Sequence, residues 1–180
     1  PVIQTIINYI RSRPRGSVHA GVSLECSTWS SSHIRDKRDG TPGRLMRDTD
    51  NILGFPDQHG QLPISVMSSN IVIDNVVQIL HVVADHGGRS LAESPVHRRE
   101  GSPDYIPGCE RHVHMFDHPS FQKFIKKYSS TLNAIDQCMF TDKSPDSIYK
   151  KATSILLTGD FNKHGQSLLS KRCNHPEFIH

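Results

Sequence analysis

Apolar residues recur at helical intervals along the chain and predict four helices. The first lies near the N-terminus and would align Val2, Ile3, Ile6, Ile7 and Ile10 on one face. A second would open at the run that contains Cys26 and continue to about Arg38. The last two are predicted over residues 119–134 and 145–157.

The two later helices carry local start signals. In the 119–134 helix, Asp117 or His118 can serve as the N-cap, and Pro119 suits the first turn. Its expected apolar face consists of Phe121, Phe124, Ile125, Tyr128, Leu132 and Ile135. The 145–157 helix would begin at Ser144 and Pro145, because a serine cap followed by proline is a common helix start.

Residues 71–84 form the most apolar stretch, and its pattern fits two structures. The high content of β-branched residues favours two strands that are interrupted near Asp74 and Asn75, with the second strand over residues 76–84. However, five of its apolar side chains would also share one helical face: Ile73, Val76, Val77, Leu80 and Val83. We expect the strands and keep the helix as the alternative.

Together these elements predict one α+β domain over residues 1–180, with a small central sheet flanked by helices. The apolar share of 35% is low, and the segment 35–63 is rich in glycine and proline, so long polar loops should wrap a modest core. The net charge of +3 is small, and acidic residues interrupt its denser basic stretches. This charge favours a solvated surface over a dedicated nucleic-acid interface.

The cysteines and the chain start bear on the cellular setting. Cys26, Cys109, Cys138 and Cys173 are scattered without a C-x-x-C pair, which favours a reducing compartment. Neither a signal peptide nor an apolar run long enough to span a bilayer is visible, so no membrane partner is expected. A cytoplasmic protein, or one exported by a signal-independent route, fits this pattern.

Cys26 is the first candidate for chemistry. A thiol becomes a nucleophile when a helix N-terminus and a nearby imidazole lower its pKa, and Cys26 is followed by the expected second helix. If residues 76–84 form a strand, His81 would lie beside the Gly87–Gly88 turn and could face the thiolate. His97 could then orient the imidazole of His81.

The run Glu25-Cys26-Ser27, together with His81-Val82-Val83 and the glycine turn, resembles the papain-like peptidoglycan amidases. In that family, a cysteine opens a helix and a histidine begins an apolar strand. The resemblance covers roughly residues 23–97 and implies that Cys26 is the nucleophile, His81 the general base and His97 the orienting residue. Thr28 departs from the family, which usually has glycine at that position.

A second candidate is the dense run of potential metal ligands over residues 109–118. Its candidate ligands are Cys109, His112, His114 and His118, and Asp117 lies within the same run. These side chains can all bind zinc or a similar metal, and His112 and His114 would point the same way if they lay in a strand. The alternative interpretation is a polar loop that leads into the helix at Pro119.

The third candidate is the run Gly159-Asp160-Phe161-Asn162, which resembles the core motif of the endonuclease/exonuclease/phosphatase family. That resemblance implies that Asp160 and Asn162 hold a metal ion, with His164 nearby. The other metal-binding elements of that family have no counterpart in this sequence, and a simple turn explains the same letters.

The sequence therefore leads to one favoured function and two alternatives. We expect a thiol-dependent hydrolase or acyl transferase that acts on an amide bond of a protein or peptide-like substrate without a cofactor. The first alternative is a metal-dependent nuclease or phosphoesterase with zinc or magnesium, in which nucleic acid would be a partner. The second is a non-enzymatic interaction module.

Overall fold

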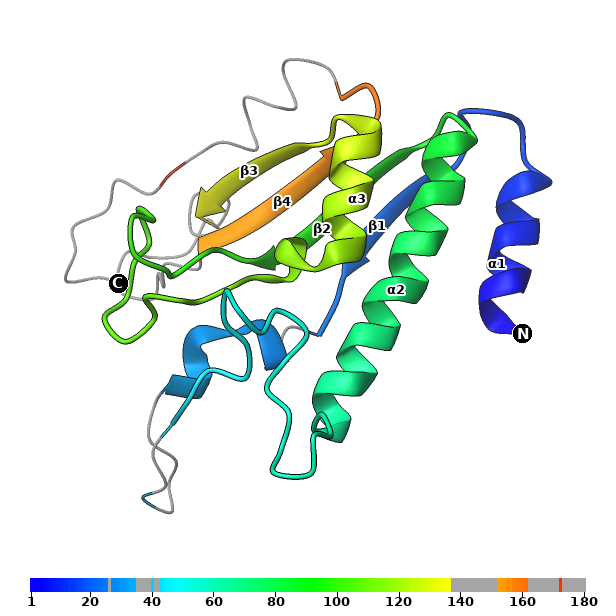
Figure 1. Cartoon of the computed structure of the whole chain (residues 1–180). Coiled ribbons are helices and arrows are strands. Elements are labelled where there is room, and N and C mark those ends of the chain that lie inside the picture. Colours follow the sequence, from blue (N-terminus) through cyan, green and yellow to red (C-terminus); the bar gives the residue numbers. More distant parts are fainter. Residues whose placement is uncertain (26, 35–39, 41–42, 137–151, 162–171, 173–180) are drawn as a thin grey trace.

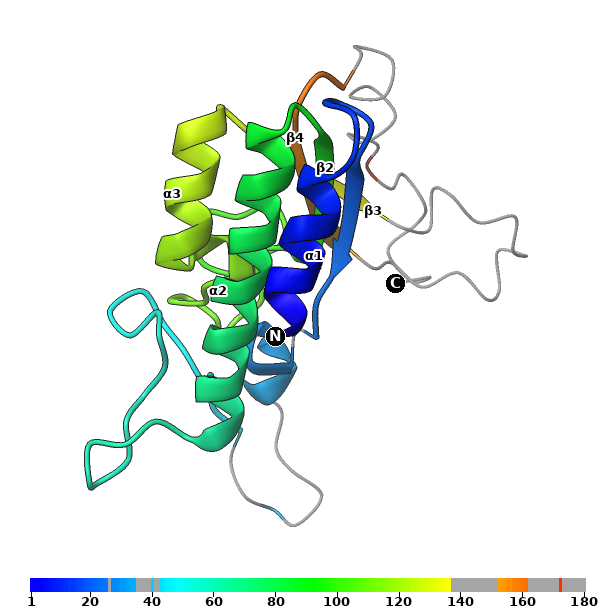
Figure 2. The same ribbon diagram turned by 90° about the vertical axis from the view of Figure 1, so that its right-hand side faces the viewer.

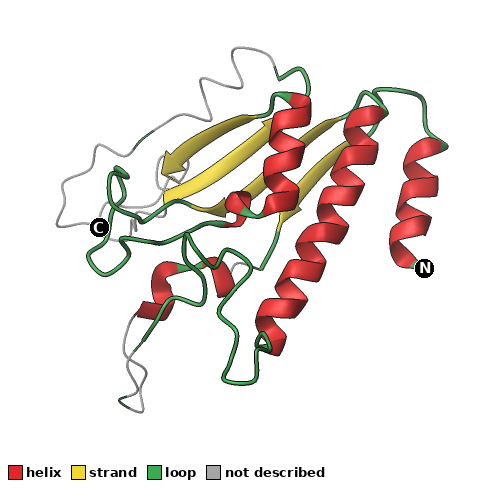
Figure 3. Cartoon of the chain, in the orientation of Figure 1, coloured by secondary structure: helices red, strands yellow, loops and turns green. Residues whose placement is uncertain are grey.

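The fold of this chain, seen in a computed structural model, is an α+β arrangement in which helices flank a small mixed sheet (Figures 1 and 3). The structure describes all residues except 26, 35–39, 41–42, 137–151, 162–171 and 173–180. The described elements are α1 (Val2–Arg11), β1 (His19–Ser23), η1 (Ser27–Trp29), η2 (Ser31–Ile34), α2 (Ile64–Asp85), β2 (Arg89–Pro95), η3 (Met115–Asp117), α3 (Pro119–Tyr128), β3 (Thr131–Asp136) and β4 (Ala152–Thr158). The expected fold class is confirmed.

The sheet has the strand order β1-β2-β4-β3. Strand β1 runs parallel to β2, whereas β4 runs antiparallel to both of its neighbours. Helices α2 and α3 cover one face of the sheet, and α1 packs beside α2 (Figure 2). The main core fills the space between this face and the helices, where Ala92 of β2 and Leu156 of β4 meet Leu80 of α2 and Phe124 of α3. A second, smaller cluster contains Ile135, Ile155 and Leu157.

Helix α2 corrects the expectation of two strands over residues 71–84. The whole stretch is one continuous helix, and its buried positions Ile73, Val77, Leu80 and Val83 follow the helical period. Pro63 precedes its first turn, and Gly87 follows its end with a positive φ of 78°. The packed face outweighs the modest helix penalty of the β-branched residues.

Helix α2 is also long and apolar enough, by length and composition alone, to cross a membrane. The core helix of a soluble protein meets the same test. In this fold, the buried face of α2 contributes Ile73, Val77 and Leu80 to the main core, whereas Ile64, Ile71 and Val72 on the same helix are exposed.

Two predicted helices differ from the observed elements. The helix expected over residues 119–134 ends at Tyr128, because Ser129 adopts a left-handed backbone (φ 48°) and the chain turns into β3. Residues 152–157, expected in the last helix, belong to strand β4 instead. Every residue of β4 is buried, as expected for a central strand that is covered on both faces.

The segment after Cys26 forms shorter elements than expected. The short 3₁₀ turns η1 and η2 replace the predicted helix as far as Ile34, and residues 35–38 lie outside the described residues. The indole of Trp29 is buried, and its Nε1–H donates to Ser69 of α2 (2.9 Å). The guanidinium of Arg47 stacks on the same indole, with its central carbon 3.8 Å from the ring centroid. These contacts fix this segment against the first half of α2.

Candidate metal centre

Three potential metal ligands converge where the chain leaves the sheet. His97 follows the last residue of β2 by two positions, and His114 immediately precedes η3. Asp117 is the last residue of η3, and its Oδ2 accepts a hydrogen bond from the backbone N–H of His114 (3.0 Å). This backbone bond holds the carboxylate next to the imidazole of His114. One turn of 3₁₀ helix and the end of one strand therefore position the cluster.

Two of the three distances within this cluster are close to those between ligands of a tetrahedral ion. Oδ2 of Asp117 lies 3.3 Å from Nδ1 of His114 and 3.5 Å from Nε2 of His97. One ligand atom from each of the three residues lies within 4.8 Å of the other two. Zinc bonds of about 2.0–2.1 Å in a tetrahedron separate neighbouring ligand atoms by about 3.4 Å. Octahedral magnesium at the same bond length gives about 2.9 Å, so the spacing favours zinc.

His114 provides the main evidence that this cluster is a binding site. Its side chain is 1% exposed, yet neither ring nitrogen makes a hydrogen bond of good geometry among the described residues, although Nδ1 faces both the carboxylate and the backbone N–H of Asp117. Nδ1 is close enough to Asp117 for an ion pair, but the direction of approach is not that of a hydrogen bond. Buried polar atoms normally have partners, because each unsatisfied group costs about 1–3 kcal/mol. A metal ion between His114 and Asp117 would satisfy Nδ1.

The other side of the cluster faces solvent. The side chain of His97 is 20% exposed and that of Asp117 is 19% exposed. The imidazole of His97 stacks on that of His114, with ring centroids 3.6 Å apart. His114 thus forms the buried wall of the site, while His97 and Asp117 form its accessible rim.

Protonation favours metal binding at neutral pH. Burial lowers the pKa of His114 and outweighs the opposing effect of Asp117, so the imidazole stays neutral and can donate a lone pair. Burial alone would raise the pKa of Asp117, but the imidazoles of His114 and His97 outweigh it and hold that pKa well below its usual range. The site therefore presents a carboxylate beside a neutral imidazole, which is the form that metal binding requires.

The structure places His112 outside this group. Its Nδ1 accepts a hydrogen bond from the backbone N–H of Arg98 (3.1 Å), and its Nε2 lies 3.1 Å from the carbonyl oxygen of Trp29. Because the Arg98 N–H can only donate, Nδ1 must be the acceptor, and Nε2–H donates to Trp29. Burial lowers the pKa of His112 to about 4. Residues 112–114 also form no strand, so the expected shared face of His112 and His114 is absent.

Cys109 and His118 do not join the cluster either. Cys109 is fully buried, and burial raises the pKa of its thiol, which disfavours the thiolate. Nδ1 of His118 accepts a hydrogen bond from the backbone N–H of Ser120 (3.3 Å), so His118 caps α3 as expected from the sequence. The edge of its ring packs against the indole of Trp29.

The structure places His81 and His97 of the thiol hypothesis in different surroundings. Cys26 itself lies outside the described residues. His81 lies on α2 rather than on a strand, and its Nδ1 is 3.1 Å from the hydroxyl of Tyr128. The strand that the amidase resemblance requires at this histidine is therefore wrong. His97 contacts His114 and Asp117 instead of His81.

Asp160 lies at the opposite end of the sheet from the histidine cluster. It follows β4 by two residues, and Thr158 at that end of β4 pairs with Ser90. His97 follows β2 beyond Pro95, which pairs with Thr153. At about 3.4 Å per residue, the strand between the two ends spans roughly 17 Å. A joint site of Asp160 and the histidines is therefore not formed, and Asn162 and His164 lie outside the described residues.

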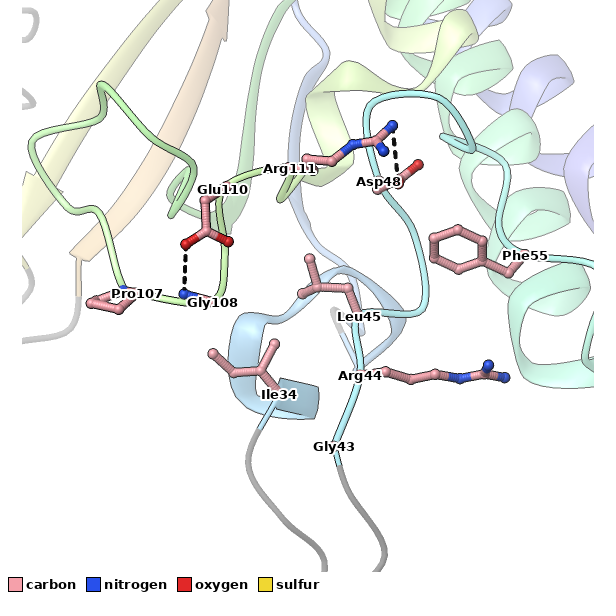
Figure 4. A pocket seen from close by; sticks show the side chains of 10 residues that line it. All are labelled: Ile34, Gly43, Arg44, Leu45, Asp48, Phe55, Pro107, Gly108, Glu110 and Arg111. Carbon is pink, nitrogen blue, oxygen red and sulfur yellow. Dashed lines mark hydrogen bonds and ion pairs between the residues drawn. The ribbon is translucent and has the colours of Figure 1, made fainter.

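A separate cavity of about 580 Å³ lies between residues 43–55 and the loop 107–111 (Figure 4). None of the three clustered residues lines it. Two of its acidic side chains already have partners: Glu110 accepts a hydrogen bond from the backbone N–H of Gly108 (2.9 Å), and Asp48 pairs with Arg111 (3.2 Å). This cavity is the more spacious site, but the imidazole whose two ring nitrogens both lack a hydrogen bond of good geometry lies in the histidine cluster.

The cluster overlaps the ligand set expected from the sequence only in part. His114 was expected as a ligand and Asp117 lay in the same run of potential ligands, whereas His97 was assigned to a thiol site. The signal that could have joined them is the spacing His97-x16-His114-x2-Asp117, with one histidine just after a strand. No family model, curated protein or solved structure matches this chain.

Proposed function

We propose that this domain is a metal-dependent hydrolase in which His97, His114 and Asp117 hold a zinc ion. The observation that carries the proposal is the buried imidazole of His114, whose Nδ1 lies 3.3 Å from Oδ2 of Asp117 and makes no hydrogen bond of good geometry among the described residues. This function belongs to the metal-dependent class that the sequence offered as its first alternative.

Zinc is favoured over magnesium for two reasons. Two nitrogen ligands and one carboxylate oxygen suit zinc, whereas magnesium prefers a shell of oxygen atoms and water. The ligand separations of 3.3 and 3.5 Å also fit a tetrahedral zinc site. Iron(II) can use the same ligand types, and metal competition distinguishes it from zinc.

A hydrolytic role follows from the number and exposure of the ligands. Structural zinc sites usually have four protein ligands, whereas catalytic sites have three and keep one position for water. Here three protein ligands converge, and two of them reach solvent. A zinc-bound water has a pKa near about 7 and supplies hydroxide at neutral pH. The residues themselves hold the ion and leave one side open to a substrate.

The first experiment measures metal content and affinity. The metal-free protein is titrated with zinc, and we expect one ion per chain. Asp117→Asn keeps the acceptor for the backbone N–H of His114 but removes the charge, so it should weaken zinc binding without unfolding the chain. The matched control is His59→Asn, because His59 is exposed and lies far along the chain from the cluster. Equal affinity in wild type and Asp117→Asn contradicts the ligand assignment.

The second experiment tests hydrolysis by the zinc-loaded protein. An activated carboxylic ester and an activated phosphodiester, both with nitrophenol leaving groups, report the two main classes of hydrolytic chemistry. Hydrolysis of either substrate should depend on zinc and disappear in both His97→Ala and Asp117→Asn. Stoichiometric zinc without hydrolysis of either substrate would limit the site to a structural role and reject the hydrolase assignment.

A further inference from the structure

The proposed zinc ligands come from two chain segments that must be held together. Sixteen residues separate His97 from His114, and the chain between them forms turns and loops without a strand or a helix. Holding the two ends of a flexible loop of this length close together costs conformational entropy. Some contact near the two ligands must therefore fix their separation before the ion binds.

His112 makes this contact directly. Its Nδ1 accepts the N–H of Arg98, the residue after His97, and His112 itself lies two residues before His114. One imidazole therefore joins the two ligand segments. On its other side, Nε2–H donates to the carbonyl oxygen of Trp29, which anchors the junction to η1. With 2% exposure, His112 has both nitrogens satisfied inside the fold.

The anchor at Trp29 is itself rigid. The indole Nε1–H donates to Ser69 of α2, and the guanidinium of Arg47 covers the indole face. The guanidinium of Arg47 is in turn held by the carbonyl oxygen of Ile52 (2.9 Å) and the side chain of Asn70 (2.7 Å). Contacts with α2 and Arg47 therefore fix Trp29, and the carbonyl oxygen of Trp29 in turn fixes His112.

We propose that His112 is the positioning residue of the metal centre, acting by joining Arg98 and Trp29 so that His97 and His114 face a common ion. This inference rests on the proposed metal-binding function. His112 does not touch the ion in this arrangement, because both of its nitrogens are occupied. It acts as an outer support that presets the ligand geometry, and the loss of such supports weakens metal binding by about 10–100-fold.

The two hydrogen bonds can be separated by substitution. In His112→Asn, the side-chain oxygen can occupy the place of Nδ1 and accept the Arg98 N–H. In His112→Gln, the amide nitrogen can occupy the place of Nε2 and donate to Trp29. His112→Leu fills the space but makes neither bond. Because the Arg98 bond joins the two ligand segments directly, we expect zinc affinity to fall in the order wild type, Asn, Gln, Leu.

The measurement combines zinc affinity with the visible spectrum of the cobalt-substituted protein. We expect a loss of about 10–100-fold in affinity for His112→Leu, with a changed cobalt spectrum, and partial rescue of both in His112→Asn. The matched control is Val113→Ala, which removes buried packing between His112 and His114 but no hydrogen bond. Val113→Ala should lower the free energy of unfolding. Its zinc affinity should stay within about threefold of the wild-type value, and its cobalt spectrum should be unchanged.

The outcomes separate this inference from the proposed function. Absence of zinc binding by the wild-type protein rejects the metal centre itself, and with it the role of His112. Zinc binding that is lost in Asp117→Asn but is equal in wild type, His112→Asn and His112→Leu retains the metal centre and rejects the positioning role. A loss of affinity in Val113→Ala that matches the loss in His112→Leu also rejects it, because packing alone would then explain the effect.

Discussion

Oδ2 of Asp117 lies 3.3 Å from Nδ1 of His114 and accepts the backbone N–H of the same histidine. The carboxylate is thus fixed by the main chain while its side-chain contact with the imidazole is not a hydrogen bond. This arrangement leaves Nδ1 without a hydrogen bond of good geometry, although the ring is buried. In a chain with twelve histidines, these contacts distinguish His114 from an ordinary loop histidine.

Zinc should stabilise the folded protein through this pair. A ligand that binds only the native state at about 100 times its dissociation constant adds about 2.7 kcal/mol to the free energy of unfolding. We expect this increase in denaturant unfolding of the wild-type protein, and little or none for Asp117→Asn. His59→Asn should respond like the wild type. An equal zinc response in Asp117→Asn would place the binding site elsewhere.

The metal-free protein should lose stability between about pH 6.5 and pH 4. The pKa of His112 is about 4 in the fold and 6.5 as a free side chain, so below pH 6.5 only the unfolded chain takes up this proton. The stabilisation is complete above pH 6.5 and is lost as the pH falls toward 4. The difference corresponds to about 3 kcal/mol for His112, and His114, whose pKa is also lowered, acts in the same direction.

His112→Asn tests this assignment in the presence of a chelator. Its free energy of unfolding should fall less steeply over the same pH interval than that of the wild type. The pKa of Asp117 is lowered in the fold, so the stability that this group contributes persists down to its unfolded pKa near 3.9 and is lost only below it. If the free energy of unfolding of His112→Asn fell as steeply as that of the wild type over this pH interval, the loss of stability would come from other groups.

The parts of the fold that were predictable from the sequence are those set by local signals. The apolar spacing of Val2–Arg11 predicted α1, and the cap at His118 with Pro119 predicted the start of α3. The end of α3 was missed because Ser129, a non-glycine residue, adopts a left-handed backbone there. Such a residue gives no local signal of its own.

The remaining errors arise from contacts that are distant in sequence. Strand β4 lacks alternation because both of its faces are buried, and the serine–proline pair upstream resembled a helix start. The three residues proposed as metal ligands were divided between two hypotheses because β2 brings His97 to His114 only in the folded chain. Spacing along the sequence cannot show this proximity, whereas the dense histidine run did include two of the three clustered residues, His114 and Asp117.

Phe124 should be among the strongest single contributors to stability on α3. Its side chain is fully buried and its ring packs against His81 and Tyr128. We expect Phe124→Ala to cost about 3–5 kcal/mol in denaturant unfolding, because it loses burial and leaves a cavity. Leu132→Ala is the matched control, since Leu132 is 44% exposed on β3 and its loss should cost less than about 1 kcal/mol. If Leu132→Ala cost more unfolding free energy than Phe124→Ala, a face of α3 without Phe124 would be the buried one.

The thiol hypothesis predicts an effect of His81 on the reactivity of Cys26, but the position of His81 on α2 leads us to expect none. Replacing His81 would slow alkylation of Cys26 if the two formed a nucleophile–base pair. Glu25 and Ser27 line a hollow with residues of α2 no later than Ile73. At about 1.5 Å per residue, His81 is about 12 Å further along that helix. Its Nδ1 is also within 3.1 Å of the Tyr128 hydroxyl.

We therefore expect His81→Ala to leave the rate of Cys26 alkylation at pH 7 unchanged within about twofold, because Nδ1 of His81 already contacts the hydroxyl of Tyr128. The measurement is competitive labelling of the folded protein, in which each cysteine is quantified on its own peptide. Buried Cys109, whose pKa is raised, provides the slow internal reference. Tyr128→Phe controls for loosening of the contact between α2 and α3, because it removes the hydroxyl bonds to His81 and Asp85 but keeps the ring. Slower labelling of Cys26 in His81→Ala, but not in Tyr128→Phe, would restore the cysteine–histidine pair as the leading hypothesis.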